Sequence, residues 1–238
     1  FLVIIYDHIM KKKFNFGILS TENNPLLPFY IKAMLNRKIF NIIIINDEKK
    51  FSNFDKKIWK ERTNDYFENK ISKEFIINKN IEIYKVKNHN DLKAIRLYKK
   101  LNINCLLNAG TPRKLSNQLI KSMALGVINI HPGLLPFYRG CTAVEWSILN
   151  DDKVSNTAHF IDRGFDTGPI IKVEWYKFSK KATYQDIRTK VYSRGCRLAA
   201  EILFKINNND LSIKKAKPQN NLKGKYWSPI NKKNMKLV

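Results

Sequence analysis

Residues 103–131, INCLLNAGTPRKLSNQLIKSMALGVINIH, contain the pattern that decides the fold. An apolar run over 103–110 ends in a glycine, residues 113–123 have the spacing of a helix, and a second apolar run covers 126–131. Two short apolar runs separated by a helix are typical of a β-α-β unit, whose two strands lie parallel in one sheet. This stretch therefore predicts an α/β protein.

The same alternation continues along the chain in both directions. Further strands are expected at residues 14–20, 39–45, 81–86, 155–162 and 169–178. Helices are expected at residues 25–37, 91–101, 142–150 and 183–206, with one or two surface helices within 47–75. The run at 39–45 is continuous and rich in isoleucine, which indicates a strand buried on both faces. We predict a mainly parallel twisted sheet with helices on both faces, formed by residues 14–206.

The two ends of the chain differ from this pattern. The sequence begins with Phe1, and Met10 is followed by KKKFNFGILS, which is typical of a natural start. Residues 1–13 are therefore interpreted as a disordered or non-native leader. Residues 207–238 are mostly polar and basic, so we expect a lightly structured basic tail after the domain.

The net charge of the chain indicates which kinds of molecule it could bind. The sequence has 44 Lys and Arg against 20 Asp and Glu, a net charge of +24. Such a charge is typical of proteins that bind nucleic acid or other anions. Because the positive residues are dispersed and accompany many Asn and Ile residues, we favour a compositional bias and do not expect a nucleic-acid partner. The alternative, a non-enzymatic anion or nucleic-acid binder, stays open.

Several other classes are disfavoured. No apolar run approaches the ~18 residues that a bilayer crossing needs, so no membrane partner is expected. The cysteines, Cys105, Cys141 and Cys196, form no C-x-x-C pair, which argues against a disulfide framework and a zinc site. No metal is expected, and the expected location is the cytoplasm. The motifs G-x-G-x-x-G, G-x-x-x-x-G-K-[ST], H-E-x-x-H and G-x-S-x-G are absent.

Candidate catalytic residues lie in INIHPGLLPFYRG, residues 128–140, where Asn129 and His131 precede the turn at Pro132 and Gly133. Because strand side chains alternate between faces, Asn129 and His131 leave the same face at the end of a strand, where α/β sheets bind ligands. An amide N–H can stabilise an oxyanion, and an imidazole can give or take a proton. The alternative is a buried structural histidine beside a turn asparagine.

Two loops add further candidates. In FIDRGFDTGPII, residues 160–171, Asp166 lies between two glycines, and its carboxylate could orient an imidazole or accept a proton. The alternative is a plain turn between two strands. In NAGTPRKL, residues 108–115, the backbone could hydrogen-bond a flat heterocycle. The alternative is an ordinary strand-to-helix connection with Thr111 as the helix N-cap.

The order and spacing of these motifs resemble the formyltransferase family that uses 10-formyltetrahydrofolate. The resemblance covers residues 14–205 and rests on Asn129-x-His131-Pro-Gly-Leu-Leu-Pro, Tyr138-Arg139-Gly140, Trp146-Ser-Ile-Leu-Asn150 and Asp166-Thr-Gly-Pro. It implies a Rossmann-like fold, and formyl transfer from that folate to an amine. In this resemblance Asn129, His131 and Asp166 are catalytic: Asn129 and protonated His131 stabilise the oxyanion, and Asp166 orients the imidazole. The folate is expected to contact Gly110, Thr111, Pro112, Arg113, Leu115, Asp162, Arg163, Gly164 and Phe165.

The acceptor amine is the most open part of the function. Glycinamide-ribonucleotide formyltransferases have a Gly-Ser-Asn phosphate loop after the first strand, whereas this chain has LSTENNPLLPF at 19–29. Methionyl-tRNA formyltransferases have an additional domain of about a hundred residues, for which the length after residue 206 is too short. We therefore expect an amino sugar nucleotide, with glycinamide ribonucleotide second and methionyl-tRNA third.

The expected acceptor contacts are spread over the chain: Ser20, Thr21, Asn23, Gly133, Arg139, Tyr226 and Trp227. Tyr226 and Trp227 could stack on a base or sugar. The alternative is that they anchor the tail to the domain. A tail of this kind could also dock on a second copy of the chain, so a homodimer is one possible assembly.

Overall fold

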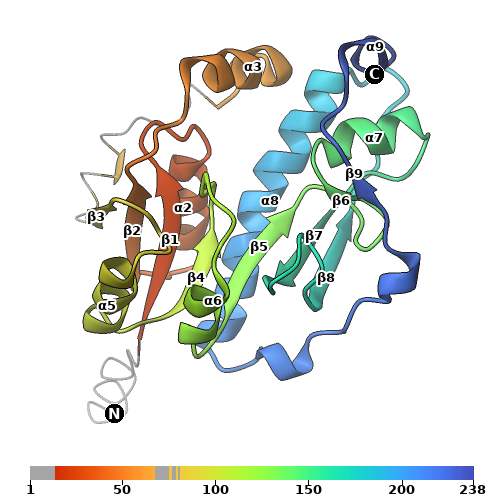
Figure 1. The fold of residues 1–238 in the computed structure, drawn as a ribbon. Helices are drawn as coiled ribbons and strands as arrows, with labels where there is room; N and C mark the ends of the chain where they lie inside the picture. The colour runs from red at the N-terminus through yellow and green to blue at the C-terminus, as the bar shows by residue number, and fades with distance from the viewer. Residues whose placement is uncertain (1–13, 68–74, 77–78, 80) are drawn as a thin grey trace, which may run out of the picture.

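The computed structural model of the chain describes residues 14–67, 75–76, 79 and 81–238 (Figure 1). In this part of the chain the main sheet has seven strands, in the order β3-β2-β1-β4-β5-β7-β8. They are β1 (Asn15–Thr21), β2 (Ile42–Asp47), β3 (Glu82–Val86), β4 (Ile103–Asn108), β5 (Val127–His131), β7 (Ser155–Phe160) and β8 (Ile170–Trp175). The first five strands in this order are parallel, and β7 runs antiparallel to both β5 and β8. The predicted mainly parallel sheet is confirmed.

Helices cover both faces of this sheet (Figure 1). The helices are α2 (Leu27–Asn36), α3 (Asn53–Thr63), α5 (Leu92–Lys100), α6 (Asn117–Ser122), α7 (Ala143–Leu149), α8 (Tyr184–Asn207) and α9 (Lys232–Met235). Helices α2 and α8 pack together on one face, and α5 and α6 lie on the other. Helix α8 begins with a capping box between Thr183 and Asp186, which defines its first turn.

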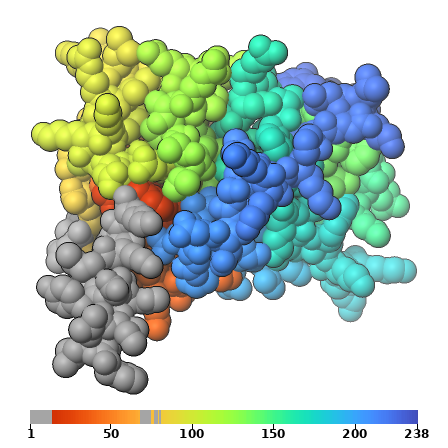
Figure 2. Space-filling model, turned by 90° about the horizontal axis from the view of Figure 1, so that it is seen from below, coloured from red at the N-terminus to blue at the C-terminus, as the bar shows by residue number. Residues whose placement is uncertain are grey.

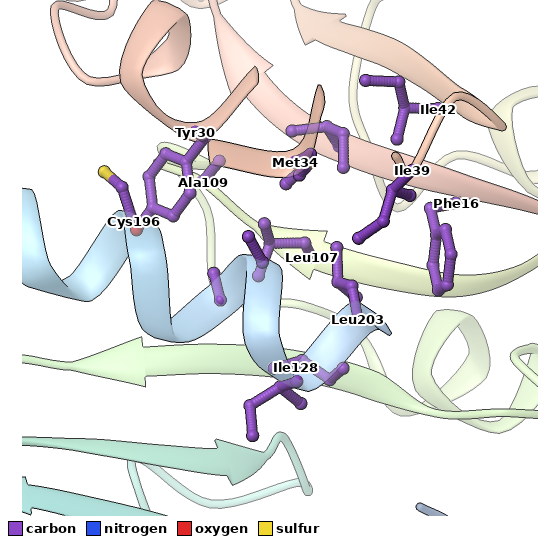
Figure 3. Packing of buried hydrophobic residues seen from close by; sticks show 14 of the residues in the cluster. Phe16, Tyr30, Met34, Ile39, Ile42, Leu107, Ala109, Ile128, Cys196 and Leu203 are labelled. Atoms are coloured by element: carbon purple, nitrogen blue, oxygen red, sulfur yellow. The ribbon is translucent and has the colours of Figure 1, made fainter. Parts of the chain in front are cut away.

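The alternation of side chains in β1 divides the core between the two faces. Phe16 and Ile18 point toward α2 and α8, whereas Leu19 points toward α5 and α6. Figure 3 shows the first of these clusters, in which Phe16 and Leu107 of the sheet face Met34 of α2 and Leu203 of α8. This packing holds the sheet rigid, so that the loops at its carboxyl edge start from fixed positions.

One predicted boundary is wrong, and the difference matters for the site. The helix expected at 113–123 begins only at Asn117, and its N-cap is Ser116, whose side chain accepts a hydrogen bond from the backbone N–H of Leu119. Thr111 is therefore not the N-cap. Its hydroxyl lies 2.7 Å from Nδ1 of His89 instead. Residues 111–116 are thus free to form a longer loop at the end of β4.

The C-terminal residues contain several short elements. They form two 3₁₀ turns (Ile213–Lys215 and Asn221–Lys223), the strand β9 (Tyr226–Trp227) and α9. Strand β9 pairs in parallel with β6 (Arg139–Gly140) in a second, two-stranded sheet. Figure 2 shows the blue atoms of this segment spread over the face of the molecule that is seen from below.

Some of the predictions concern residues outside the described part of the chain, and others concern membrane helices, metal sites and disulfides. The leader at 1–13, and any helix within 68–74, lie outside the described residues. None of the described helices combines the length and the apolarity that a membrane crossing needs. Within the same residues no group of three or more His, Cys, Asp or Glu side chains is arranged to hold a metal ion, and the three cysteines are unpaired.

Candidate functional site

The candidate site lies at the carboxyl edge of the parallel strands. Strand β1 is central, the chain moves outward from it to β2 and β3 on one side, and β4 and β5 lie on its other side. The loops after β1 and β4 therefore diverge, which leaves the crevice where α/β sheets bind ligands. Asn108 and Asn129 lie at the ends of β4 and β5, in register across the pair.

Asn108 connects the two strand ends, although it was not among the predicted site residues. Its Nδ2 donates to Oδ1 of Asn129 at 3.1 Å. Its Oδ1 accepts from the backbone N–H groups of Gly110 and Thr111 at 3.1 and 3.0 Å. One amide thus orients the Asn129 side chain and shapes the loop that follows β4. The signal in the sequence is the asparagine that ends the strand in LLNAG.

His159 is a second residue that the sequence interpretation missed. It lies opposite Asn129 on the antiparallel strand β7, and Nδ2 of Asn129 is 3.2 Å from its Nε2. Its Nδ1 is 2.9 Å from the carbonyl of Phe160, which can only accept, so Nδ1 has the proton in the neutral ring. Nε2 then accepts from Asn129. A histidine within the predicted strand 155–162 was visible, but its pairing with Asn129 was not.

Asp166 lies between two imidazoles. Its Oδ2 is 3.6 Å from Nδ1 of His131, and its Oδ1 is 3.6 Å from Nε2 of His159. The backbone N–H of Gly140 also donates to Oδ2 at 2.9 Å. Burial acts to raise the pKa of Asp166, but the two imidazoles and this N–H hold that pKa well below its usual range. Asp166 is therefore ionised at neutral pH.

His131 is almost completely enclosed, with 3% of its surface exposed. Nε2 donates to the carbonyl of Tyr138, and Gly133 leaves room for the ring, because a Cβ at Gly133 would lie 3.1 Å from Nε2. Burial lowers the pKa of His131, while Asp166 acts to raise it. His131 and Asp166 thus lie side by side, with His131 behind the carboxylate.

Two cavities meet at the Asn108–Asn129 pair. The first, of about 170 Å³, is bounded by the loop after β4 and the loop after β7, and His159 and Asp166 line it. The second, of about 250 Å³, lies between the loop after β1 and helices α3 and α8. His131 lines neither of them. The site therefore presents the Asn129 amide to two separate volumes.

The first cavity contains most of the residues expected to contact folate. Its lining includes Thr111, Arg113, Leu115, Asp162, Gly164 and Phe165. Gly110 lines the second cavity instead, and Pro112 and Arg163 line neither. Phe165 is exposed at the edge of the cavity, and the Lys114 ammonium lies 4.2 Å from the centre of its ring.

A buried polar cluster at the end of β2 anchors the loop after β4. The guanidinium of Arg113 makes two hydrogen bonds to the carboxylate of Asp47, at 2.7 and 3.0 Å. His89 contacts Thr111 through Nδ1 and the carbonyl of Ile45 through Nε2, at 2.7 and 3.0 Å. The Asp47 and His89 side chains are fully buried. This loop is therefore tied to the sheet through two side chains of its own.

A family model decides the classification. The model described as formyl transferase matches residues 18–203. The chain belongs to the formyl transferase family. The expected family is thereby confirmed, and the matched residues include both loops of the first cavity and the whole Asn129, His131 and Asp166 group.

Curated relatives of this formyl transferase chain are methionyl-tRNA formyltransferases. The one from Clostridium tetani is 29% identical over 167 residues, covering 69% of this chain and 53% of the relative. The one from Flavobacterium psychrophilum is 30% identical over 141 residues, covering 58% and 44%. The chain thus spans about half the length of the curated relatives it matches.

Solved structures share the fold of the formyl transferase chain. Glycinamide ribonucleotide transformylase 1 from Symbiobacterium toebii has a TM-score of 0.66 at 16% identity, covering 88% of this chain and 95% of that one. An N-formyltransferase from Helicobacter canadensis, in complex with folinic acid and dTDP-3-aminofucose, has a TM-score of 0.63 at 21% identity, covering 92% and 72%. The predicted Rossmann-like fold is confirmed.

The residues expected to contact the acceptor do not gather at the second cavity. Ser20 and Thr21 are buried, and Ser20 accepts a hydrogen bond from Asn24 at 3.0 Å. Asn24, rather than Asn23, lines the cavity and also donates to the carbonyl of Ala109. Gly133 is enclosed against Ala143 and the ring of His131. Ser20, Thr21, Asn23 and Gly133 therefore do not line the second cavity.

Arg139, Tyr226 and Trp227 are occupied by contacts within the formyl transferase chain. Arg139 is buried, and its guanidinium donates to Gln219 and Asn221, so the expected contact with an acceptor has no support in this arrangement. The Trp227 ring stacks on Tyr138 and packs against Trp146, which supports the tail-anchoring alternative. Tyr226 is exposed and lies beside Phe165, with ring centres 6.3 Å apart.

Proposed function

We propose that this chain transfers a formyl group from 10-formyltetrahydrofolate to a primary amine of a small acceptor, an amino sugar nucleotide by preference. The observation that supports this most is the position of Asn129 between two cavities, beside an ionised Asp166 and two imidazoles. Transfer between two substrates requires two binding volumes that meet at one polar group, and this arrangement supplies them.

The first cavity suits the folate. Leu115 and Phe165 give it apolar walls, and the loops around Thr111 and Gly164 border it with backbone polar groups, a combination suited to a flat heteroaromatic ring. The complex of the Helicobacter canadensis enzyme with folinic acid is consistent with a folate in a protein of this fold. In the proposal, the formyl carbon lies at Asn129, where the two cavities meet.

The chemical step follows from the charges around that point. The acceptor nitrogen attacks the formyl carbon, and the carbonyl oxygen becomes negative while the nitrogen becomes positive. Nδ2 of Asn129 donates to the oxyanion, and the His131 ring, which lines neither cavity, lies behind the Asp166 carboxylate. Asp166 stabilises the new ammonium. The carbon–nitrogen bond to the folate then breaks, the folate nitrogen takes up a proton, and the acceptor nitrogen loses one to water.

The second cavity supports a sugar acceptor. Tyr30, Phe51, Trp59 and Tyr192 form aromatic walls, and its other lining residues include Asn24 and Asn156. No charged side chain of the described residues lines it. A sugar ring can pack its apolar face on aromatic rings and hydrogen-bond its hydroxyls to amides.

Positive charge behind the aromatic wall supports the nucleotide part. The Arg188 guanidinium lies 5.2 Å from the centre of the Trp59 ring and 4.7 Å from that of Tyr192. Arg62 and Arg188 share one carboxylate, that of Glu145, which leaves one net positive charge in the group. Such a charge would attract the diphosphate of an acceptor whose sugar occupies the cavity.

Methionyl-tRNA is the second candidate acceptor. It is favoured by the curated relatives of the chain, which are methionyl-tRNA formyltransferases, and by the net charge of +24. Glycinamide ribonucleotide is the third, since one solved structure of this fold is a glycinamide ribonucleotide transformylase. The three acceptors differ in size and charge, so a direct comparison distinguishes them.

The test is formyl transfer from 10-formyltetrahydrofolate to amino sugar nucleotides, glycinamide ribonucleotide and charged initiator tRNA, with the product followed by mass spectrometry. We expect transfer to an amino sugar nucleotide by the wild-type chain, and transfer slower by ~10²–10³ in Asn129→Ala. Faster transfer to tRNA or to glycinamide ribonucleotide would replace the acceptor assignment. Transfer to none of them, together with no binding of folate by calorimetry, would overturn the proposed function.

A further inference from the structure

The C-terminal segment, residues 217–228, packs directly against the strand that borders the candidate catalytic residues. Strand β9 pairs with β6 so that Arg139 is opposite Tyr226 and Gly140 is opposite Trp227. Gly140 has a φ of 94°, and a Cβ there would lie 2.5 Å from the carbonyl oxygen of Trp227. The close approach of the two backbones therefore requires a glycine at this position.

Gln219 is the central contact of this segment. Its Oε1 accepts from Nε and Nη2 of Arg139, at 3.2 and 2.7 Å. Its Nε2 donates to the backbone carbonyls of Asp166 and Gly168, at 2.9 and 2.7 Å. One side chain thus connects β6 with the loop that contains Asp166. The amide oxygen of Gln219 accepts two hydrogen bonds and its amide nitrogen donates two, so no donor or acceptor position of this amide is left over.

Both of the connected segments contact the catalytic candidates. The carbonyl of Tyr138, just before β6, accepts from Nε2 of His131. The N–H of Gly140, at the end of β6, donates to Oδ2 of Asp166. The distance between Asp166 and His131 is therefore set by two segments that are far apart in sequence, and Gln219 joins them from outside.

The conformation of the Asp166 loop explains why such a link is needed. Asp166 has a φ of 54°, in the left-handed region that aspartate tolerates better than most residues. At Gly168 a Cβ would lie 1.9 Å from the carbonyl oxygen of Phe160, so the loop passes very close to β7. The two hydrogen bonds from Gln219 hold the carbonyl groups of this turn in place.

We propose that Gln219 is a positioning residue, which fixes Asp166 relative to His131 through its own four hydrogen bonds. Its effect on turnover rests on the proposed formyl transfer, whereas its effect on the Asp166–His131 pair does not. Gln219 itself lines neither cavity.

Two substitutions separate the contacts of Gln219. Gln219→Met has a similar length and removes all four hydrogen bonds. Gln219→Glu keeps the two bonds from Arg139, which hold the C-terminal segment, but cannot donate to the carbonyls of Asp166 and Gly168. The matched control is Asn221→Ala, which removes another hydrogen bond of Arg139 and touches neither carbonyl.

The first readout is the titration of the His131 imidazole by NMR in the intact chain. The groups that face this ring are the Asp166 carboxylate, the His159 ring and the Tyr138 carbonyl. Because Asp166 raises the pKa of His131, moving the carboxylate away in Gln219→Met should lower that pKa. Asn221→Ala should titrate like the wild type. An unchanged His131 titration in Gln219→Met would overturn the proposal whether or not the chain transfers formyl groups.

The second readout is turnover with the acceptor identified by the assay above. We expect kcat to fall about tenfold or more in both Gln219 variants, with the KM values for folate and acceptor nearly unchanged, because displacement of a reacting group mainly affects the rate. Full activity in Gln219→Glu would show that the glutamine only anchors the segment, and would contradict the positioning role. A wild-type chain without activity would count against the proposed function and leave the NMR result to decide this inference.

Discussion

At the scale of single residues, the site is a set of polar side chains whose mutual hydrogen bonds determine which group donates and which accepts. Asn129 receives a hydrogen bond from Asn108 at its oxygen, so its Nδ2 points away toward His159 and the cavities. Asp166 is ionised between two imidazoles, and His131 is oriented by the carbonyl of Tyr138. Each group therefore has a defined role as donor or acceptor before any substrate binds.

The first prediction concerns Asn129. Asn129→Ala removes the amide that we propose to stabilise the oxyanion, so kcat should fall by ~10²–10³, a typical loss for one such donor. The folate KM should change little, and the melting temperature should stay near that of the wild type. Asn117→Ala, an exposed asparagine at the start of α6, is the control and should keep full activity. An Asn129→Ala chain with wild-type kcat would exclude the oxyanion role.

The second prediction concerns the pH dependence of stability. The pKa of His131 is lowered by burial, so the unfolded chain binds more protons and stability rises with pH in this range. The contribution is complete above the unfolded pKa of ~6.5 and is lost as the pH falls through the folded value. We expect the melting temperature to fall from pH 7.5 to pH 5 less steeply in His131→Gln than in the wild type. Parallel curves for the two chains would contradict the lowered pKa.

At the scale of elements, the site depends on where strands and helices end. The loop after β4 continues to Ser116 because α6 starts late, and this provides the residues that line the first cavity. The start of this loop is held by Asn108 and its middle by the Asp47–Arg113 pair. The cavity is thus formed by a loop that is fixed to the sheet at two points.

The third prediction tests that anchor. Asp47→Asn removes a buried carboxylate that accepts two hydrogen bonds from Arg113, so unfolding free energy should fall by about 2 kcal/mol, and the folate KM should rise several-fold. The acceptor KM should stay the same, because Asp47 does not line the second cavity. Steady-state kinetics and thermal unfolding measure both effects.

A second ion pair provides the comparison for this prediction. Glu201 pairs with Lys172 and Lys205 on the outer side of α8, and it lines neither cavity. Glu201→Gln should therefore change neither KM value and should cost little stability. An equal rise of the folate KM in Asp47→Asn and Glu201→Gln would show that the effect comes from general destabilisation.

At the scale of the whole molecule, the C-terminal segment packs against the two segments that contact the catalytic candidates. The chain leaves the end of α8, crosses the surface and returns to β6 beside Asp166 (Figure 1). Its basic residues add to a net charge of +24, which is spread over the sequence. Dispersed charge of this kind gives weak attraction to any polyanion without a defined binding surface.

The fourth prediction follows from this dispersed charge. We expect the chain to bind non-specific duplex DNA weakly at low ionic strength and to lose that binding by about 200 mM salt. Fluorescence anisotropy with a labelled duplex over a salt series measures it. Tight binding that persists at about 200 mM salt would favour the nucleic-acid binder over the small-molecule enzyme.

Much of the fold follows from local patterns. Short apolar runs, such as the isoleucines of β2, predict strands, and apolar residues at helical spacing predict the larger helices. The positions of Asn129 and His131 at a strand end follow from the same alternation. The family follows from motifs at fixed spacing, and the match over residues 18–203 confirms it.

The remaining features depend on contacts between segments that are distant in sequence. His159 faces Asn129 only because β7 runs antiparallel to β5, and Arg139 meets Gln219 across 80 positions of the chain. No periodicity encodes such pairs, since each residue alone is an ordinary polar position. The residue order thus specified the sheet, its helices and the chemical groups of the site. Three-dimensional packing selected which of those groups face a cavity and which, like Arg139 and Trp227, hold the chain together.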